Sequence, residues 1–180
     1  MLLVTPVAAQ LIVWQPNWAQ FFGYGSCVCE NADETIPDCW GNTCYFGASG
    51  AKMWGGWNGR GFWRDVDWHE GVLAAVLEIT DASQLGHDPE PGHITEIFQL
   101  AGQARVYING VYKGTYNFGL HMFDADASVN PPGIPGNQPD LVGFTLFRNV
   151  PGPPPNWWYQ SGINRISGEI VTWWYPAYSG

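Results

Sequence analysis

The sequence predicts a single all-β domain over residues 1–180, built as a jelly roll or a β-barrel. The chain has 23 Gly, 14 Pro and 11 Trp, and 16% of its residues are aromatic. This composition is typical of strands and turns and is poor in residues that favour helices. Turn signals also recur between short β-branched and aromatic runs, and no convincing long amphipathic helix is evident. A domain of this size buries about 70% of its unfolded surface, so it can build its own core.

The clearest element is a β-hairpin over residues 104–118. Two strand-like arms flank Asn109-Gly110, and this dipeptide favours a type I′ turn, in which both central residues have positive φ. A two-residue loop sets the cross-strand register and gives an aliphatic pair on one face and an aromatic pair on the other. The expected pairs are Ile108 with Val111 and Tyr107 with Tyr112. Because both faces would be partly covered, we expect the hairpin to lie inside a sandwich or a barrel.

Further strands are expected on both sides of this hairpin. Each is a run of apolar, β-branched or aromatic residues of strand length. In chain order they are residues 10–15, 19–24, 72–80, 141–148 and 168–175. Alternation along the fourth run places Phe144, Leu146 and Arg148 on one face.

Residues 27–61 are expected to form a loop insertion rich in Cys, Gly and Trp, and other long loops are rich in Gly and Pro. Six glycines and three tryptophans within residues 46–63 make a regular element costly, because ordering each glycine costs additional backbone entropy. The tryptophans either plug the end of the core or form a contact surface for glycan rings or a partner chain. The candidate contact residues are Trp54, Trp57, Trp63, Trp157, Trp158 and Tyr159.

The four cysteines, Cys27, Cys29, Cys39 and Cys44, lie within eighteen residues of one another. A bridge between the first two is sterically poor, which leaves the pairings 27–39 with 29–44 and 27–44 with 29–39. Each disulfide would stabilise the fold by about 3 kcal/mol. A zinc or iron–sulfur site and unpaired thiols are the alternatives, but the spacing matches neither paired Cys-x-x-Cys knuckles nor the usual ferredoxin runs. We predict two disulfides and expect no cofactor, with a metal ion or an iron–sulfur cluster at the four cysteines as the open alternative.

Charge and hydropathy limit the partners. Seven Lys and Arg residues against sixteen Asp and Glu residues give a net charge of -9, which repels phosphate backbones and anionic lipid. We therefore expect no nucleic acid partner and no membrane insertion, since no apolar run approaches the ~20 residues of a membrane span. The apolar start at Met1 lacks Lys and Arg, and Pro6 cuts it short of a signal-peptide core. We expect the protein to be located in a virion or outside the cell, and a cytoplasmic location is the open alternative.

Residues 91–148 resemble the cupins, a family with a double-stranded β-helix fold. The resemblance rests on residues 91–102, which carry His93, on residues 105–110, and on the Pro-Pro-Gly turn within residues 129–135. It implies a jelly-roll-like barrel. Metal-binding cupins use two histidines one residue apart, a glutamate and a third histidine after the turn.

The metal-ligand pattern of the cupins is incomplete in this chain. His93 has no second histidine two residues away, Thr95 stands in the place of the glutamate, and residues 136–138 include no histidine. Ligands from different strands could substitute for the missing ones. The candidates are His87, His93, Glu96 and His121.

Residues 65–70 concentrate further polar side chains. In a strand, Asp65, Asp67 and His69 would share one face, which is typical of an exposed polar edge and also compatible with a cation site. No nucleophile elbow, phosphate-binding glycine loop or zinc-protease motif occurs in the sequence. These observations favour a protein without enzymatic activity, although they do not decide the question.

The sequence therefore favours a structural or adhesive protein that contacts neighbouring subunits and forms homo-oligomers. A virion component of decoration, minor capsid or tail type fits the acidic charge and the Trp-, Gly- and Pro-rich segments, which can cover neighbouring subunits. Two alternatives remain open. One is a glycan-binding β-sandwich module. The other is a cupin-type metal-dependent dioxygenase or isomerase, as the resemblance implies.

Overall fold

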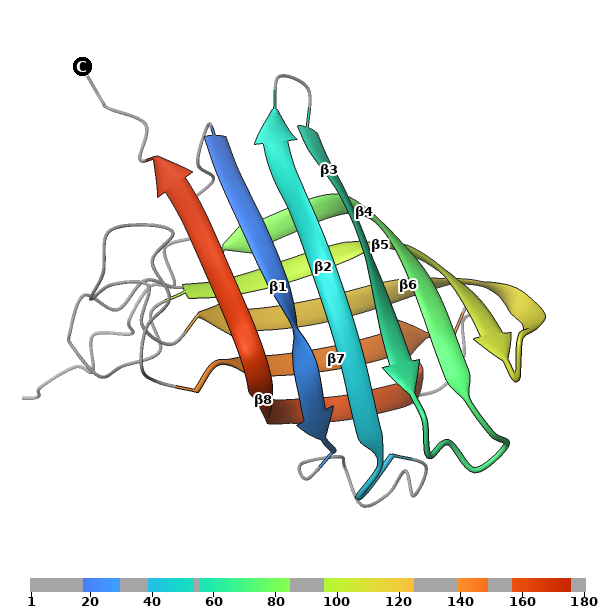
Figure 1. Ribbon diagram of the computed structural model, residues 1–180. Coiled ribbons are helices and arrows are strands. Elements are labelled where there is room, and N and C mark those ends of the chain that lie inside the picture. The colour runs from blue at the N-terminus through green and yellow to red at the C-terminus, as the bar shows by residue number, and fades with distance from the viewer. Residues whose placement is uncertain are drawn as a thin grey trace, which may run out of the picture.

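The computed structural model describes residues 18–29, 39–53, 56–84, 96–124, 139–148 and 157–175, which form one closed antiparallel barrel (Figure 1). Its eight strands are β1 (Trp18–Val28), β2 (Thr43–Met53), β3 (Gly56–Asp65), β4 (Leu73–Gln84), β5 (Glu96–Ile108), β6 (Val111–Asp124), β7 (Leu141–Phe147) and β8 (Trp157–Tyr175). Figure 1 shows the sheet flattened into two layers, with β1, β2 and β3 crossing over β5, β6 and β7. The described residues contain no helix that is long and apolar enough to span a membrane.

The strand order is that of an up-and-down barrel. Each strand pairs with the next one along the chain, and β8 closes the barrel on β1. The all-β class and the barrel are thus confirmed. A jelly roll contains Greek keys, in which strands distant in sequence become neighbours. Apart from the closing pair, every pairing among the described strands is between consecutive strands, so the order differs from the jelly roll that we expected.

The predicted hairpin forms the β5–β6 connection. Asn109 has a φ of 50° and Gly110 a φ of 79°, as a type I′ turn requires. The register pairs Tyr107 with Tyr112 and Ile108 with Val111, as predicted. The Asn109 side chain also accepts a hydrogen bond from Val72 N at 2.9 Å and donates one to Glu70 O at 2.8 Å. These bonds tie the hairpin tip to the β3–β4 connection.

Four of the five other expected strands are present. Residues 19–24 lie in β1, residues 72–80 fall almost entirely in β4, residues 141–148 match β7, and residues 168–175 form the last part of β8. The remaining expected strand, residues 10–15, lies outside the described residues.

The loop insertion expected over residues 27–61 is wrong, because β2 and β3 run through most of it. The glycines permit these strands to pack closely instead of preventing them. A Cβ built on Gly59 would lie 2.8 Å from Ser49 O and 3.1 Å from Gly50 Cα. Only glycine allows the two backbones to approach this closely. The pairing on both sides of each strand offsets the entropic cost of ordering the glycines.

Large apolar side chains fill the inside of the barrel. Side chains along a strand point alternately into and out of the barrel. The buried residues of β3 illustrate this, because they are separated from one another by even numbers of positions. Phe144 and Leu146 share the inner face, as expected, whereas Arg148, which was predicted to lie with them, follows the end of β7 and is exposed. The largest fully buried side chains are Trp63, Tyr159, Phe21, Phe46, Phe118, Phe144, Leu73, Leu77, Ile79, Leu100 and Leu120. Each contributes roughly 1.5–3 kcal/mol of burial free energy.

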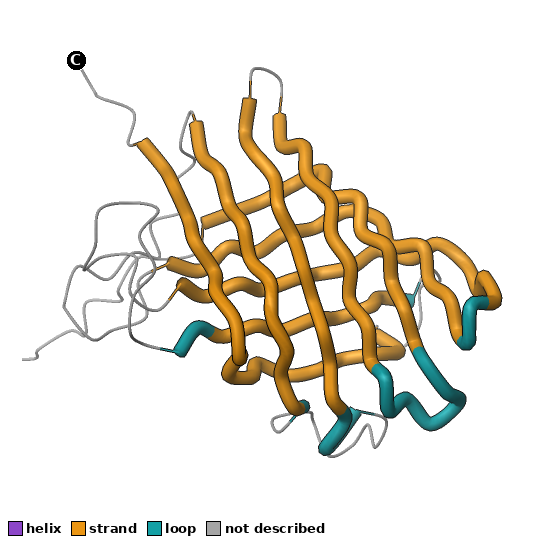
Figure 2. Tube along the Cα trace, in the orientation of Figure 1, coloured by secondary structure: helices purple, strands orange, loops and turns teal. Residues whose placement is uncertain are grey.

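One end of the barrel carries the turns at residues 39–42, 66–72 and 109–110, which Figure 2 shows in teal. In an up-and-down barrel, the odd-numbered strands end and the even-numbered strands begin at the same end. All four cysteines lie there. We call it the cysteine end.

Candidate functional site

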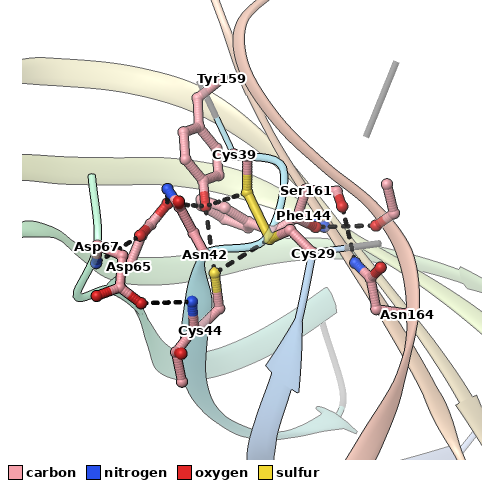
Figure 3. Close-up of a disulfide and its surroundings, with 12 residues drawn as sticks. Cys29, Cys39, Asn42, Cys44, Asp65, Asp67, Phe144, Tyr159, Ser161 and Asn164 are labelled. Atoms are coloured by element: carbon pink, nitrogen blue, oxygen red, sulfur yellow. Dashed lines mark hydrogen bonds between the residues drawn. A yellow bond between two sulfur atoms is a disulfide. The ribbon is translucent and has the colours of Figure 1, made fainter. Parts of the chain in front are cut away.

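The four cysteines converge at the cysteine end, and all of them are buried. Cys27 and Cys29 are two residues apart at the end of β1, so they share the inner face. Cys44 lies near the start of β2, and Cys39 precedes the turn into that strand. A disulfide joins Cys29 to Cys39, with their Cα atoms 5.9 Å apart (Figure 3). This bridge belongs to one of the two predicted pairings.

The other two cysteines are free thiols in direct contact. Cys27 and Cys44 are cross-strand partners in the β1–β2 register. The hydrogen bond between them lowers the pKa of Cys27 and raises the pKa of Cys44, and burial raises the pKa of Cys44 further. Cys44 Sγ also lies 3.3 Å from Cys29 Sγ. Because Cys27 and Cys44 are paired across the strands and hydrogen-bonded to each other, the predicted bridge 27–44 would need little movement, but it is not formed here.

A tyrosine from β8 lies at the centre of this cluster. The Tyr159 hydroxyl lies 3.3 Å from Cys39 Sγ and 3.6 Å from Cys44 Sγ. Trp63 Nε1 donates a hydrogen bond to it at 2.9 Å. Complete burial raises the pKa of Tyr159 well above its usual value, so the phenol keeps its proton. It is therefore a hydrogen-bond donor within the cluster.

The acceptor of that proton is Asp65, the last residue of β3. Tyr159 donates to Asp65 Oδ2 at 3.1 Å, and Asn42 Nδ2 donates to the same oxygen at 3.0 Å. The backbone N–H of Asp67 donates to Oδ1 at 3.0 Å (Figure 3). Burial nevertheless raises the pKa of Asp65, because these bonds only partly replace the water that the carboxylate has lost.

The polar face expected for residues 65–70 does not form. The strand ends at Asp65, and the chain then turns. Asp65 is buried, whereas Asp67 and His69 are exposed. The Asp67 carboxylate instead accepts a hydrogen bond from Thr43 N at 2.9 Å, which holds the turn against the start of β2.

The cysteine cluster links β1, β2, β3 and β8 at the cysteine end of the barrel. Its cysteines, Tyr159 and Asp65 are each at most 5% exposed, so a substrate has no direct access to them. The sulfur atoms of Cys29, Cys39 and Cys44 lie within 4.8 Å of one another, a spacing at which thiolates could share a metal ion. While the disulfide is intact, however, two of these three sulfurs are not available as thiolates. The metal alternative stays a prediction for the reduced protein.

A groove of about 660 Å³ opens at the same end of the barrel. Lysine, arginine, glutamate and aromatic side chains line it. Among them are Glu70, Lys113, Tyr116, Arg148 and Trp158. The rings of Tyr116 and Trp158 are 5.1 Å apart. Sequence reasoning named Trp158 as a contact residue and included Glu70 in the polar cluster of residues 65–70, but it did not bring the set together, because its members come from separate strands and turns.

The predicted contact residues are distributed over different environments. Trp63 and Tyr159 are completely buried, so assigning them to a contact surface was wrong. Trp57 is half-buried and packs against the core, with its ring 6.0 Å from that of Phe21. Trp158 is half-buried and lines the groove. Trp54 and the side chain of Trp157 lie outside the described residues.

The candidate metal ligands from the cupin resemblance cannot be compared as a set. His87 and His93 lie outside the described residues, as does the side chain of Glu96. His121 is on β6, with its ring 6.5 Å from that of Phe123. Burial lowers the pKa of His121, which favours the neutral imidazole.

The outer surface carries large exposed side chains that the sequence did not reveal. We call them the aromatic face, made of Phe22, Tyr24, Tyr45, Phe62 and Val76 on β1 to β4. The registers place Tyr24 opposite Gly47, Gly47 opposite Phe62, and Phe62 opposite Val76. Tyr24, Phe62 and Val76 therefore lie in one row, with Gly47 between the first two, and Phe22 and Tyr45 are two positions from this row along β1 and β2.

Comparison with protein families, curated proteins and solved structures finds no match for this chain. Function is therefore inferred from the geometry of the cysteine cluster, the groove and the aromatic face.

Proposed function

We propose that this protein is a non-enzymatic structural or adhesive protein that assembles with further copies of itself through the aromatic face. The observation that carries the proposal is the group of neighbouring exposed residues on β1 to β4. The members of the face are between 42% and 53% exposed. Contiguous exposed apolar groups of this kind mark protein interaction sites, whereas single ones are common on any surface.

At the centre of the aromatic face, an aromatic ring covers a glycine. A Cβ built on Gly47 would lie 2.7 Å from Phe62 Cε1, so the Phe62 ring lies directly over this glycine. The rings of Phe22 and Tyr24 contact each other with centroids 5.4 Å apart. Rigid aromatic rings supply large contact area at low cost in side-chain entropy, which is why interfaces are rich in them.

Charge favours a second copy of the chain as the occupant. The exposed residues Arg60 and Arg64 flank Phe62 on β3, and Arg105 lies opposite Val76 on β5. Three of the seven cationic residues of a chain with net charge -9 thus surround the face. Exposed acids of a neighbouring copy, such as Asp67, would complement them. Such a contact joins two different surfaces and can extend into a ring or a filament.

Two further observations support this proposal. Core side chains fill the barrel and the cysteine cluster is buried, which leaves the outer surface for binding. The disulfide supports a virion or extracellular location, because disulfides persist in oxidising environments. A decoration, minor capsid or tail protein would combine such a location with assembly. We do not favour a cupin-type enzyme, because the up-and-down order of the described strands differs from the jelly-roll-like barrel that the cupin resemblance implies.

Analytical ultracentrifugation tests the proposal. We expect the wild-type protein to form larger species as its concentration rises, and added salt to reverse this by screening the arginines. Phe62→Ser should reduce the association, whereas Val111→Ser, which changes an exposed residue at the hairpin tip, should not. A wild-type protein that stays monomeric at high concentration and low salt would overturn the proposal, as would equal effects of the two substitutions.

A further inference from the structure

Two β-bulges supply residues to the groove at the cysteine end. Between β5 and β6, Val106 pairs with Gly114 and Tyr107 pairs with Tyr112. Lys113 is therefore an extra residue without a cross-strand partner. A bulge of this kind re-aims the extra side chain and is frequent next to functional sites.

The second bulge lies between β7 and β8. Leu146 pairs with Tyr159 and Phe147 pairs with Trp157, so Trp158 is the extra residue. Lys113 and Trp158 belong to different strand pairs, yet both line the same groove. Two independent register shifts thus deliver a cation and an indole to one place.

The aromatic side of the groove is held in position. The Trp158 ring packs against the core and meets the Trp68 ring edge-on, with centroids 6.3 Å apart. A Cβ on Gly114 would lie 3.1 Å from Tyr116 Cε2, so the Tyr116 ring lies over the glycine. Trp158 Nε1 is buried and has no hydrogen-bond partner among the described groups. The same holds for Trp68 Nε1, so the groove presents the indole of Trp158 as an apolar surface.

The charged side of the groove selects the ligand. Lys113 and Arg148 are two of only seven cationic residues in an acidic chain, and both line this groove. Together they favour a carboxylate, which an arginine can bind through two parallel hydrogen bonds. The Glu70 carboxylate at the same groove accepts hydrogen bonds and therefore favours hydroxyl groups. A nucleic acid is disfavoured by the net charge of -9.

We propose that the groove binds a carboxylated sugar, such as a hexuronic acid unit of an acidic polysaccharide. The apolar face of the sugar ring would lie against Tyr116 and Trp158. Its carboxylate would meet Lys113 and Arg148, and its hydroxyls would meet Glu70. The groove volume of about 660 Å³ lies within the usual range for small-ligand sites. This site is separate from the aromatic face, so it does not depend on self-assembly.

Calorimetric titration with a galacturonic acid disaccharide, and with the neutral galactose disaccharide as its matched control, tests the proposal. We expect saturable binding of the acidic sugar and at least about tenfold weaker binding of the neutral one, the loss expected for one charge-assisted hydrogen bond. Added salt should weaken the binding of the acidic sugar only. Absence of saturable binding by the acidic sugar, or equal affinity for both sugars, would overturn the proposal.

Substitutions locate the site. Lys113→Gln and Arg148→Gln should each weaken binding of the acidic disaccharide about tenfold. Arg165→Gln removes an exposed cation of β8 that does not line the groove, and it should leave the affinity unchanged. Trp158→Leu keeps an apolar side chain but removes the aromatic ring on which the sugar would stack, and it should weaken binding of both sugars alike. Equal losses for Arg165→Gln and Lys113→Gln would show only a general charge effect and would overturn the assignment.

Discussion

Replacing Cys39 by serine removes the disulfide with little other change. The Cys39 sulfur lies 3.3 Å from the Tyr159 hydroxyl, and a serine hydroxyl can keep a hydrogen bond to that group. The substitution therefore removes mainly the covalent constraint. The bridged residues, Cys29 and Cys39, are 10 positions apart. Closing a loop of that length lowers the entropy of the unfolded chain by an amount equivalent to about 2.7 kcal/mol at 25 °C.

That magnitude is about a fifth to a half of the total stability of a domain, which is about 5–15 kcal/mol. We therefore expect Cys39→Ser to lower the free energy of unfolding, measured by urea titration, by about 2.7 kcal/mol. Reductant should lower the stability of the wild-type protein by a similar amount and leave Cys39→Ser nearly unchanged. Cys27→Ser is the matched control, because it replaces a buried cysteine of the same cluster that is not bridged.

Thiol titration checks the chemistry behind this expectation. The denatured, unreduced wild-type protein should show at most two free thiols, from Cys27 and Cys44, and the reduced protein should show four. No free thiol would mean that the second predicted bridge, 27–44, also forms in solution. Four free thiols before reduction, or a reductant effect equal in wild type and Cys39→Ser, would refute the reasoning.

Two further predictions concern burial and close packing. Because burial raises the pKa of Asp65, the folded protein holds the carboxyl proton of Asp65 more tightly than the unfolded chain does, and stability is lost as the pH rises from the usual carboxyl pKa of 3.8 to the raised pKa. The stability of Asp65→Asn relative to wild type should therefore improve over that pH interval. A difference between the two unfolding free energies that stays constant with pH in urea titrations would contradict this. Gly59→Ala should lower the free energy of unfolding by roughly 1–3 kcal/mol by forcing β2 and β3 apart. Gly119→Ala, whose Cβ would meet no atom closer than 3.5 Å, should lower it clearly less. Thermal unfolding of both variants tests this, and a larger loss for Gly119→Ala would contradict it.

The elements that the sequence predicted well are set by local chemistry. The hairpin at Asn109-Gly110 follows from the positive φ values of two adjacent residues, so it needs no knowledge of the rest of the chain. The strand of β7 follows from a short alternating run. The prediction of a loop over residues 46–63 was wrong because the structure there depends on residues of a neighbouring strand. Glycine is costly in an isolated strand, but close approach to a neighbouring strand gives Gly59 a role that only the pairing of β2 with β3 reveals.

The candidate sites divide in the same way. The cysteines were recognisable as one cluster because they are close in sequence, but their central partner, Tyr159, is separated from them by more than a hundred residues. The groove was harder to predict, because Lys113 and Trp158 meet only through two shifts in strand register. A period-two pattern does not encode such a shift, since the extra residue looks like any other strand residue.

The closed barrel also explains why the cluster and the groove are neighbours. Trp158 lines the groove, and the next residue, Tyr159, is held in the cluster by its bonds to Trp63 and Asp65. The ring of Trp68 contacts both of them, with centroids 6.3 Å from Trp158 and 5.3 Å from Tyr159. The buried hydrogen bonds thus hold Tyr159 in place, and Trp158, the extra residue of the adjacent bulge, lines the groove. A ring that stacks on Trp158 would therefore rest on a surface that the cysteine cluster supports from below.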